Sequence, residues 1–209
     1  MSDPIRIADA GEGTARSVLE RTIGGGGVAL FPTDTVYALG CDPLNAVAIE
    51  RIHSLKGRDE GKPSAVMFFT PLAMRELIST LGSRTRDALG VLLPGGVTVV
   101  VHNPERRYPL ACREDPERLG VRLIEGPLAG AACAVFQTSA NRSGEPAPRS
   151  IADVDPALLG SADVAIDAGS LPGTHSTVVD VTAVDAGGGW RVLREGALSN
   201  DDLERRLSG

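Results

Sequence analysis

The feature that most constrains this chain is the alternation, from end to end, of short apolar runs with stretches of helical periodicity. Short apolar runs fit buried strands, whereas apolar residues spaced three and four apart fit one face of a helix. The predicted strands cover residues 28–31, 65–69, 97–101, 121–124, 135–138, 164–166, 177–181 and 191–193. This alternation predicts an α/β or α+β domain built on one large sheet.

Several predicted helix ends carry residues that cap helices. Asn45 can accept a hydrogen bond from the first turn of a helix, and Gly57 suits its C-terminal end. Thr70 followed by proline predicts another helix start, and Ser199 begins the last helix. Helices are also expected over 127–134 and 151–159, and before the glycine run at 24–27. The residues expected to face inward are Ala15, Val18, Leu19, Ile23, Val47, Ile49, Ile52 and Leu55.

Length and charge restrict the class of protein. The 209 residues fit one domain, and the net charge of −6 argues against a general nucleic-acid binder, so stable tRNA binding is not expected. The three cysteines form no CxxC pair, which predicts buried thiols in a reducing compartment. The N-terminus does not resemble a signal peptide, and no segment approaches the roughly 18 apolar residues of a membrane span. We therefore expect a cytoplasmic protein.

The familiar nucleotide-binding motifs are missing from the sequence. There is no GxxxxGK[ST], and the glycine run at 24–27 precedes a predicted strand instead of following one. Polar side chains gather instead in loops directly after apolar strands, where sheet-based α/β proteins tend to bind ligands. Four stretches stand out, at residues 31–41, 55–63, 137–150 and 174–180, the last followed by a strand that ends in Arg194.

Each of these stretches has an ordinary structural explanation when taken alone. Basic residues at a helix C-terminus complement the helix dipole, and Ser and Asn are common in turns. Among the histidines, His53 lies in mid-helix and is expected on the surface, whereas His175 adjoins a candidate loop. No histidine cluster indicates a metal site.

In combination, the stretches resemble a known family. The blocks PTDTVYALGC, KGR, LLPGGVT, GVRL, TSANRSGEPAP, STVVD and VLREGAL follow one another between residues 28 and 198. This order, together with the split signature KxR…SxN at Lys56, Arg58, Ser139 and Asn141, resembles the YrdC-like threonylcarbamoyl-AMP synthases. The resemblance implies a single domain over residues 1–209, with a large twisted mixed sheet flanked by helices and a concave, positively charged cavity.

The resemblance also implies a reaction. In this family the amine of threonine combines with bicarbonate to give a carbamate, which attacks the α-phosphate of ATP and expels pyrophosphate. The product, threonylcarbamoyl-AMP, supplies proteins that transfer the threonylcarbamoyl group to adenosine in tRNA. The implied enzyme is a nucleotidyltransferase that uses ATP, L-threonine and bicarbonate, with Mg²⁺ arriving on ATP and held mainly by its phosphates.

The site residues that the resemblance implies are mostly cations and hydroxyls, which suit a site that gathers several anions. Lys56 and Arg58 are the implied catalytic residues. The implied ATP contacts are Lys56, Arg58, Lys62, Ser139, Asn141 and Arg194, and the implied threonine contacts are Thr35, Arg122 and Ser176. No protein ligands to a metal are expected.

The chain also departs from the usual family pattern, and two other functions stay open at this point. Ala38, Met67, Ala147 and Arg149 differ from the residues common in the family and bear on substrate contacts. One alternative is an RNA-binding module without synthase activity, which the acidic balance and scarce aromatics disfavour. The other is a carbamoyl-transfer domain acting on carbamoyl phosphate, although acylphosphatase and zinc-finger segments are missing here.

Overall fold

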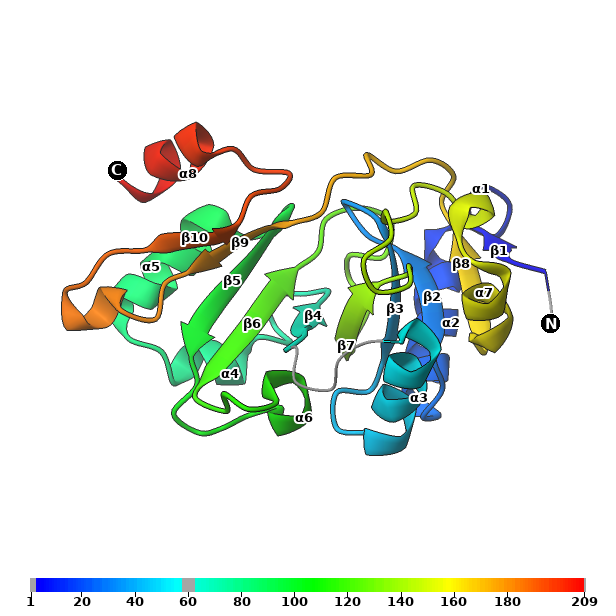
Figure 1. The fold of residues 1–209 in the computed structure, drawn as a ribbon, viewed down its shortest axis with the longest axis horizontal. Helices are drawn as coiled ribbons and strands as arrows, with labels where there is room; N and C mark the ends of the chain where they lie inside the picture. Colours follow the sequence, from blue (N-terminus) through cyan, green and yellow to red (C-terminus); the bar gives the residue numbers. More distant parts are fainter. Residues whose placement is uncertain (1–2, 58–62, 209) are drawn as a thin grey trace.

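The computed structural model describes residues 3–57 and 63–208, and its strands form one continuous sheet (Figure 1). The strands are β1 (Ile5–Arg6), β2 (Ala29–Pro32), β3 (Tyr37–Cys41), β4 (Ala65–Phe68), β5 (Val97–His102), β6 (Arg118–Leu123), β7 (Ala134–Ser139), β8 (Val164–Asp167), β9 (Thr177–Asp180) and β10 (Arg191–Arg194). Their order is β1-β8-β2-β3-β7-β4-β6-β5-β9-β10, with parallel and antiparallel neighbours. The predicted mixed sheet is confirmed, and every predicted strand is present.

Two strands, β1 and β3, were not predicted. The expected loop over 31–41 contains β3, which lies between β2 and β7 near the middle of the sheet. All five of its residues are buried, so it shows no alternation of polar and apolar positions. Gly40 and the polar turn before the strand obscure it further, because both are typical of loops. β1 has two residues and pairs only with β8.

The helices are α1 (Ile7–Ala10), α2 (Glu12–Gly24), α3 (Ala46–Lys56), α4 (Arg75–Ser79), α5 (Ser83–Leu92), α6 (Pro109–Cys112), α7 (Pro156–Ser161) and α8 (Asn200–Leu207). The predicted caps are present, since Asn45 Oδ1 accepts from the Ala48 N–H at 3.1 Å and Ser199 Oγ accepts from the Asp202 N–H at 3.2 Å. Gly57 ends α3 in the left-handed conformation that glycine favours. None of the helices within the described residues combines the length and apolar character needed to cross a membrane.

Several helix predictions are wrong in detail. Thr70 Oγ1 accepts from the Ala73 N–H, as a cap would, yet the following residues form turns and α4 begins only at Arg75. Residues 127–134 form turns and the start of β7. The stretch 151–159 is divided between a short 3₁₀ turn (Ile151–Asp153) and α7, because Pro156 starts a new helix and cannot continue an old one. Val47, expected to face inward, is 80% exposed.

The larger apolar cluster covers one face of the sheet. It joins Leu39, Val66, Val99 and Val121 to buried residues of α3, α5, α7 and α8. In Figure 1, α3 and α7 stand together at one end of the strand layer, near the N-terminus, and α5 and α8 stand at the opposite end, near the C-terminus.

The opposite face is only half covered. Directly paired residues of neighbouring strands point to the same face. Met67 pairs with both Val135 and Arg122, and Ala65 pairs with both Gln137 and Gly120, so all six side-chain positions belong to this face.

We call the apolar part of this face the covered half, where Ala29, Phe31, Ala38, Met67 and Val135 lie beneath α2 and residues 124–131. We call its polar part, with Thr98, Gly120, Arg122, Gln137 and Val178, the open half.

Candidate functional site

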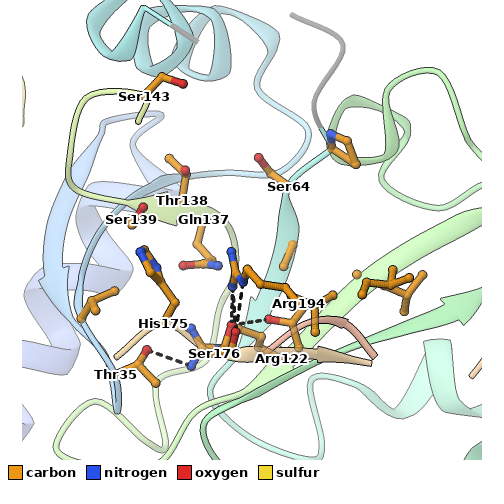
Figure 2. A pocket seen from close by; sticks show the side chains of 18 of the residues that line it. Thr35, Ser64, Arg122, Gln137, Thr138, Ser139, Ser143, His175, Ser176 and Arg194 are labelled. Atoms are coloured by element: carbon orange, nitrogen blue, oxygen red, sulfur yellow. Dashed lines mark hydrogen bonds between the residues drawn. The ribbon is translucent and has the colours of Figure 1, made fainter. Parts of the chain in front are cut away.

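A cavity of about 450 Å³ lies over the open half of the sheet (Figure 2). The structure brings predicted site residues from all four candidate stretches, and Arg122 from β6, to its wall. They are Thr35, Lys56, Arg122, Ser139, Asn141, Ser176 and Arg194. Arg58 and Lys62, the other predicted site residues, lie outside the described residues. The described lining residues include four cations, Lys56, Arg118, Arg122 and Arg194, and one carboxylate, Asp115. This balance agrees with the expected positive cavity.

Lys56 joins the two halves of the split signature. It is the last residue of α3 and only 4% exposed, and its Nζ donates hydrogen bonds to the carbonyl oxygens of Ser139 and Asn141. The Ser143 N–H in turn donates to the Lys56 carbonyl at 3.0 Å. The end of α3 and the loop after β7 are therefore fastened together, although more than 80 residues separate them in sequence.

Asn141 shapes the same loop. Its side-chain Nδ2 donates to the carbonyl oxygens of Arg142 and Glu145 at 2.8 and 2.7 Å. Its Oδ1 is buried and has no hydrogen-bond partner among the described residues. Because a buried acceptor without a partner costs free energy, this oxygen is suited to receive a hydrogen bond from a ligand.

Arg122 lies near the end of β6 with a side chain that is 2% exposed. Its Nη2 donates to Asp34 Oδ1, and also to Thr35 Oγ1 at 3.3 Å. Burial lowers the pKa of Arg122, and the neighbouring Asp34 carboxylate acts in the opposite direction. The predicted threonine contacts Thr35 and Arg122 therefore touch each other, and Asp34 is a partner that the sequence did not indicate.

Arg194 reaches the cavity from the edge strand β10. The pairing of β9 with β10 is irregular between Val192 and Arg194, as at a β-bulge, and such irregularities redirect side chains beside active sites. Arg194 donates to the Ser176 carbonyl at 2.8 Å and to Ser176 Oγ at 3.2 Å. Burial and the charge of Arg122 both lower its pKa, as expected for a cation placed near a like charge.

The histidines behave in opposite ways. His175 lines the cavity beside Ser176, as expected, and its pKa is lowered by burial and by the charges of Arg194 and Lys56. An imidazole in this position is neutral at pH 7 and can accept or donate a hydrogen bond. The prediction for His53 is wrong, because this residue is 2% exposed and packs against Phe136 with ring centroids 5.7 Å apart.

Several lining residues were not singled out from the sequence. Gln137 precedes the SxN loop on β7, Thr98 Oγ1 lies 2.8 Å from Ser176 Oγ, and Arg118 shares the cavity face of β6 with Arg122. The signal that could have found them is period-2 alternation. In Arg118–Leu123 the apolar positions 119, 121 and 123 are buried against the core, and the intervening positions face the cavity.

The described residues offer no resident metal site, since they contain no group of three or more His, Cys, Asp or Glu side chains placed to hold an ion. The three cysteines are free thiols, with Cys41 and Cys112 buried and Cys133 half-buried. Burial raises the pKa of Cys41 and of Cys133 to about 12, so these two thiols are protonated at neutral pH. The cavity lining is built mainly from cations and neutral hydrogen-bonding groups, a composition that suits the binding of anions.

The chain matches one family model and several curated relatives. The family model Sua5_yciO_yrdC, described as "Telomere recombination", matches residues 21–196. Threonylcarbamoyl-AMP synthase of Nitrosococcus oceani is 39% identical over 132 residues, or 60% of this chain and 70% of that protein. The synthase of Chromohalobacter salexigens is 34% identical over 183 residues, or 84% of this chain and 92% of that protein.

A solved structure has the same fold. Sua5 of P. abyssi complexed with L-threonine superposes with a TM-score of 0.80 at 24% identity. The match covers 98% of this chain and 60% of the Sua5 chain. The sheet and its flanking helices are therefore those of a Sua5-like domain.

Proposed function

The chain belongs to the Sua5/YciO/YrdC family, and from this premise we propose that it is an L-threonylcarbamoyladenylate synthase. As a nucleotidyltransferase it forms threonylcarbamoyl-AMP and pyrophosphate from L-threonine, bicarbonate and ATP. One observation carries the proposal: Lys56, Ser139 and Asn141 of the split signature share a cavity with Thr35, Arg122, Ser176 and Arg194. Relatives of which this chain covers 70% and 92% are named as synthases of this kind.

The reaction requires several anions to be held together. A triphosphate, a carbamate and an amino-acid carboxylate repel one another, and fixed cations facing them in a partly dry cavity offset that repulsion. Lys56 and Arg194 serve the phosphates, together with Arg58 and Lys62. Ser139 and Asn141 add neutral hydrogen bonds to the nucleotide, and Arg122, Thr35 and Ser176 hold the amino acid.

Positioning is the main catalytic contribution of this chain. The carbamate oxygen must approach the α-phosphorus while pyrophosphate leaves from the opposite side. When the site already holds both reactants in place, the entropy lost in bringing them together belongs to binding and does not add to the barrier of the chemical step. The bonds from Lys56 to the 139–141 loop fix this loop relative to the end of α3. A rigid loop keeps the nucleotide contacts in place during the transfer.

Magnesium enters the proposal as a companion of ATP. The described residues supply no cluster of carboxylates for a resident ion, and Mg²⁺ commonly keeps water and substrate phosphates as its ligands. When bound, it would neutralise phosphate charge. The product is proposed to pass to proteins that transfer the threonylcarbamoyl group to tRNA, in the cytoplasm and without stable tRNA binding by this chain.

The test is pyrophosphate release by the purified chain with ATP, L-threonine and bicarbonate, with mass spectrometry of the nucleotide product. We expect release that requires all three substrates and a product with the mass of threonylcarbamoyl-AMP. Turnover that proceeds equally with glycine or alanine would contradict the threonine assignment. Carbamoyl phosphate consumption without threonine would favour a carbamoyl-transfer domain, and RNA retention without pyrophosphate release would favour an RNA-binding module.

A further inference from the structure

The ion pair between Asp34 and Arg122 is unusually enclosed. Among the ion pairs of residues 3–57 and 63–208, it is the one in which neither side chain exceeds 10% exposure, with values of 10% for Asp34 and 2% for Arg122. The partners come from distant parts of the chain, the turn between β2 and β3 and the end of β6. Enclosure removes both charges from water, so each charged side chain depends on the other to offset the free energy of its lost hydration.

The hydrogen bonds of Arg122 are only partly used by the protein. Nη2 serves both Asp34 and Thr35, whose Oγ1 also lies 2.9 Å from Thr33 Oγ1. Nε of Arg122 is buried and has no partner among the described residues. An unpaired buried donor on a guanidinium that lines a cavity is costly in the free protein, and a carboxylate ligand would satisfy it.

An apolar residue could replace Arg122 if stability were the only requirement. Arg122 of β6 pairs with Met67 of β4, whose side chain is fully buried in the covered half. An apolar side chain at position 122 would therefore extend that core. Replacing a buried ion pair by apolar residues is often neutral or stabilising. A cation at this position, with a carboxylate to hold it, therefore points to a function outside folding.

We propose that Asp34 is a positioning residue that fixes the guanidinium of Arg122 for the carboxylate of the amino-acid substrate. The inference rests on the proposed function, because it concerns recognition of L-threonine. Asp34 occupies one nitrogen of Arg122 and ties it to the Thr33–Thr35 turn, which leaves the remaining N–H groups in a set direction. Its negative charge also opposes the repulsion between Arg122 and the nearby Arg194.

The experiment compares substrate constants of wild type, Asp34→Ala and Asp34→Asn. In Asp34→Ala we expect the KM for L-threonine to rise about 30-fold, while kcat at saturating threonine and the KM for ATP change less than about threefold. Asp34→Asn keeps an acceptor without the charge and should give an intermediate rise. The matched control is Asp163→Ala, which removes the carboxylate of an Arg51–Asp163 pair outside the cavity and should leave both KM values unchanged.

A double-mutant cycle separates positioning from a general structural effect. If Asp34 acts through Arg122, replacing Asp34 should have no further effect on threonine binding in an Arg122→Ala background. Additive losses, or equal rises in the KM for both substrates, would overturn the proposal. If Asp34→Ala does not fold, the same cycle with Asp34→Asn decides the question.

The same measurements distinguish failure of the inference from failure of the proposed function. Wild-type protein without threonine-dependent pyrophosphate release would refute the synthase assignment, and this inference with it. An active wild type with an unchanged threonine KM in Asp34→Ala and Asp34→Asn would refute the inference alone.

Discussion

The covered and open halves belong to the same face of one sheet, yet they are built for different purposes. Met67 of β4 pairs with Val135 of β7 on one side and with Arg122 of β6 on the other. Val135 lies beneath α2 in a fully apolar cluster, whereas Arg122 lines the cavity. What differs is whether another segment of the chain covers the strand.

The difference shows how one sheet serves both stability and binding. Removing apolar surface from water stabilises the fold in proportion to the area buried, at about 25 cal/mol per Å². Grouping the cations Arg122 and Arg194 acts against folding, because burial and mutual repulsion lower the pKa of Arg194. We therefore expect substitutions in the covered half to change stability, and substitutions in the open half to change activity.

The largest expected effect belongs to the covered half. Leu19 of α2 is fully buried against it, so Leu19→Ala should reduce the free energy of unfolding by about 2–5 kcal/mol, through lost burial and a residual cavity. Denaturant unfolding measures the loss. The exposed Ser17→Ala on the same helix is the control and should be near neutral. A loss of activity per folded molecule in Leu19→Ala would show that the halves are not separable.

Substitution of Arg194 in the open half should reduce activity without reducing stability. Arg194→Met removes a cation that faces the proposed phosphates, so turnover should fall roughly 10²-fold. The thermal midpoint should stay unchanged or rise, because a repulsive neighbour of Arg122 disappears. Arg191→Met, an exposed change on the same strand, is the control for pyrophosphate release. Normal turnover in Arg194→Met would exclude a phosphate role for this residue.

Two glycines on the same face offer a matched comparison, because Gly40 lies against Val135 of the covered half and Gly120 belongs to the open half. A Cβ at Gly40 would meet Val135 Cγ1 at 2.3 Å and the Phe136 carbonyl oxygen at 2.7 Å, so Gly40→Ala should cost about 1–3 kcal/mol. A Cβ at Gly120 would meet Thr98 Cγ2 at 3.5 Å, an ordinary contact, so Gly120→Ala should leave stability nearly unchanged. Equal destabilisation of the two variants in denaturant titrations would mean that the open half is packed as tightly as the covered half.

The smallest effect concerns His175. Its pKa in the folded state lies below the ordinary value of 6.5, so the unfolded chain binds more protons between the folded pKa and about 6.5. Its contribution to stability is therefore complete above pH 6.5 and is lost as the pH falls through that window. His175→Asn should flatten this part of the stability profile. NMR titration should place the imidazole midpoint below 6.5, and pyrophosphate should raise it.

Local sequence signals predicted most elements, and they failed where the burial of a residue depends on a segment that is distant in sequence. The caps at Asn45 and Ser199 were predicted because they are short-range hydrogen bonds. β3 was not predicted, because Gly40 and the polar turn before the strand are typical of loops. The prediction that His53 lies on the surface is wrong, since nothing nearby in sequence indicates that Phe136 packs against it.

The sequence by itself determined eight of the strands, several helix ends, the family, and the residue types of the KxR…SxN signature, because these depend on local periodicity and on residue identity. Only the tertiary structure decided that α2 and residues 124–131 cover one half of a face and leave the other half open. It also decided that Asp34 meets Arg122, and that Lys56 donates to the loop beyond Ser139. These contacts join segments more than 80 residues apart, and their geometry follows from how the strands are ordered in the sheet, which no short stretch of sequence specifies.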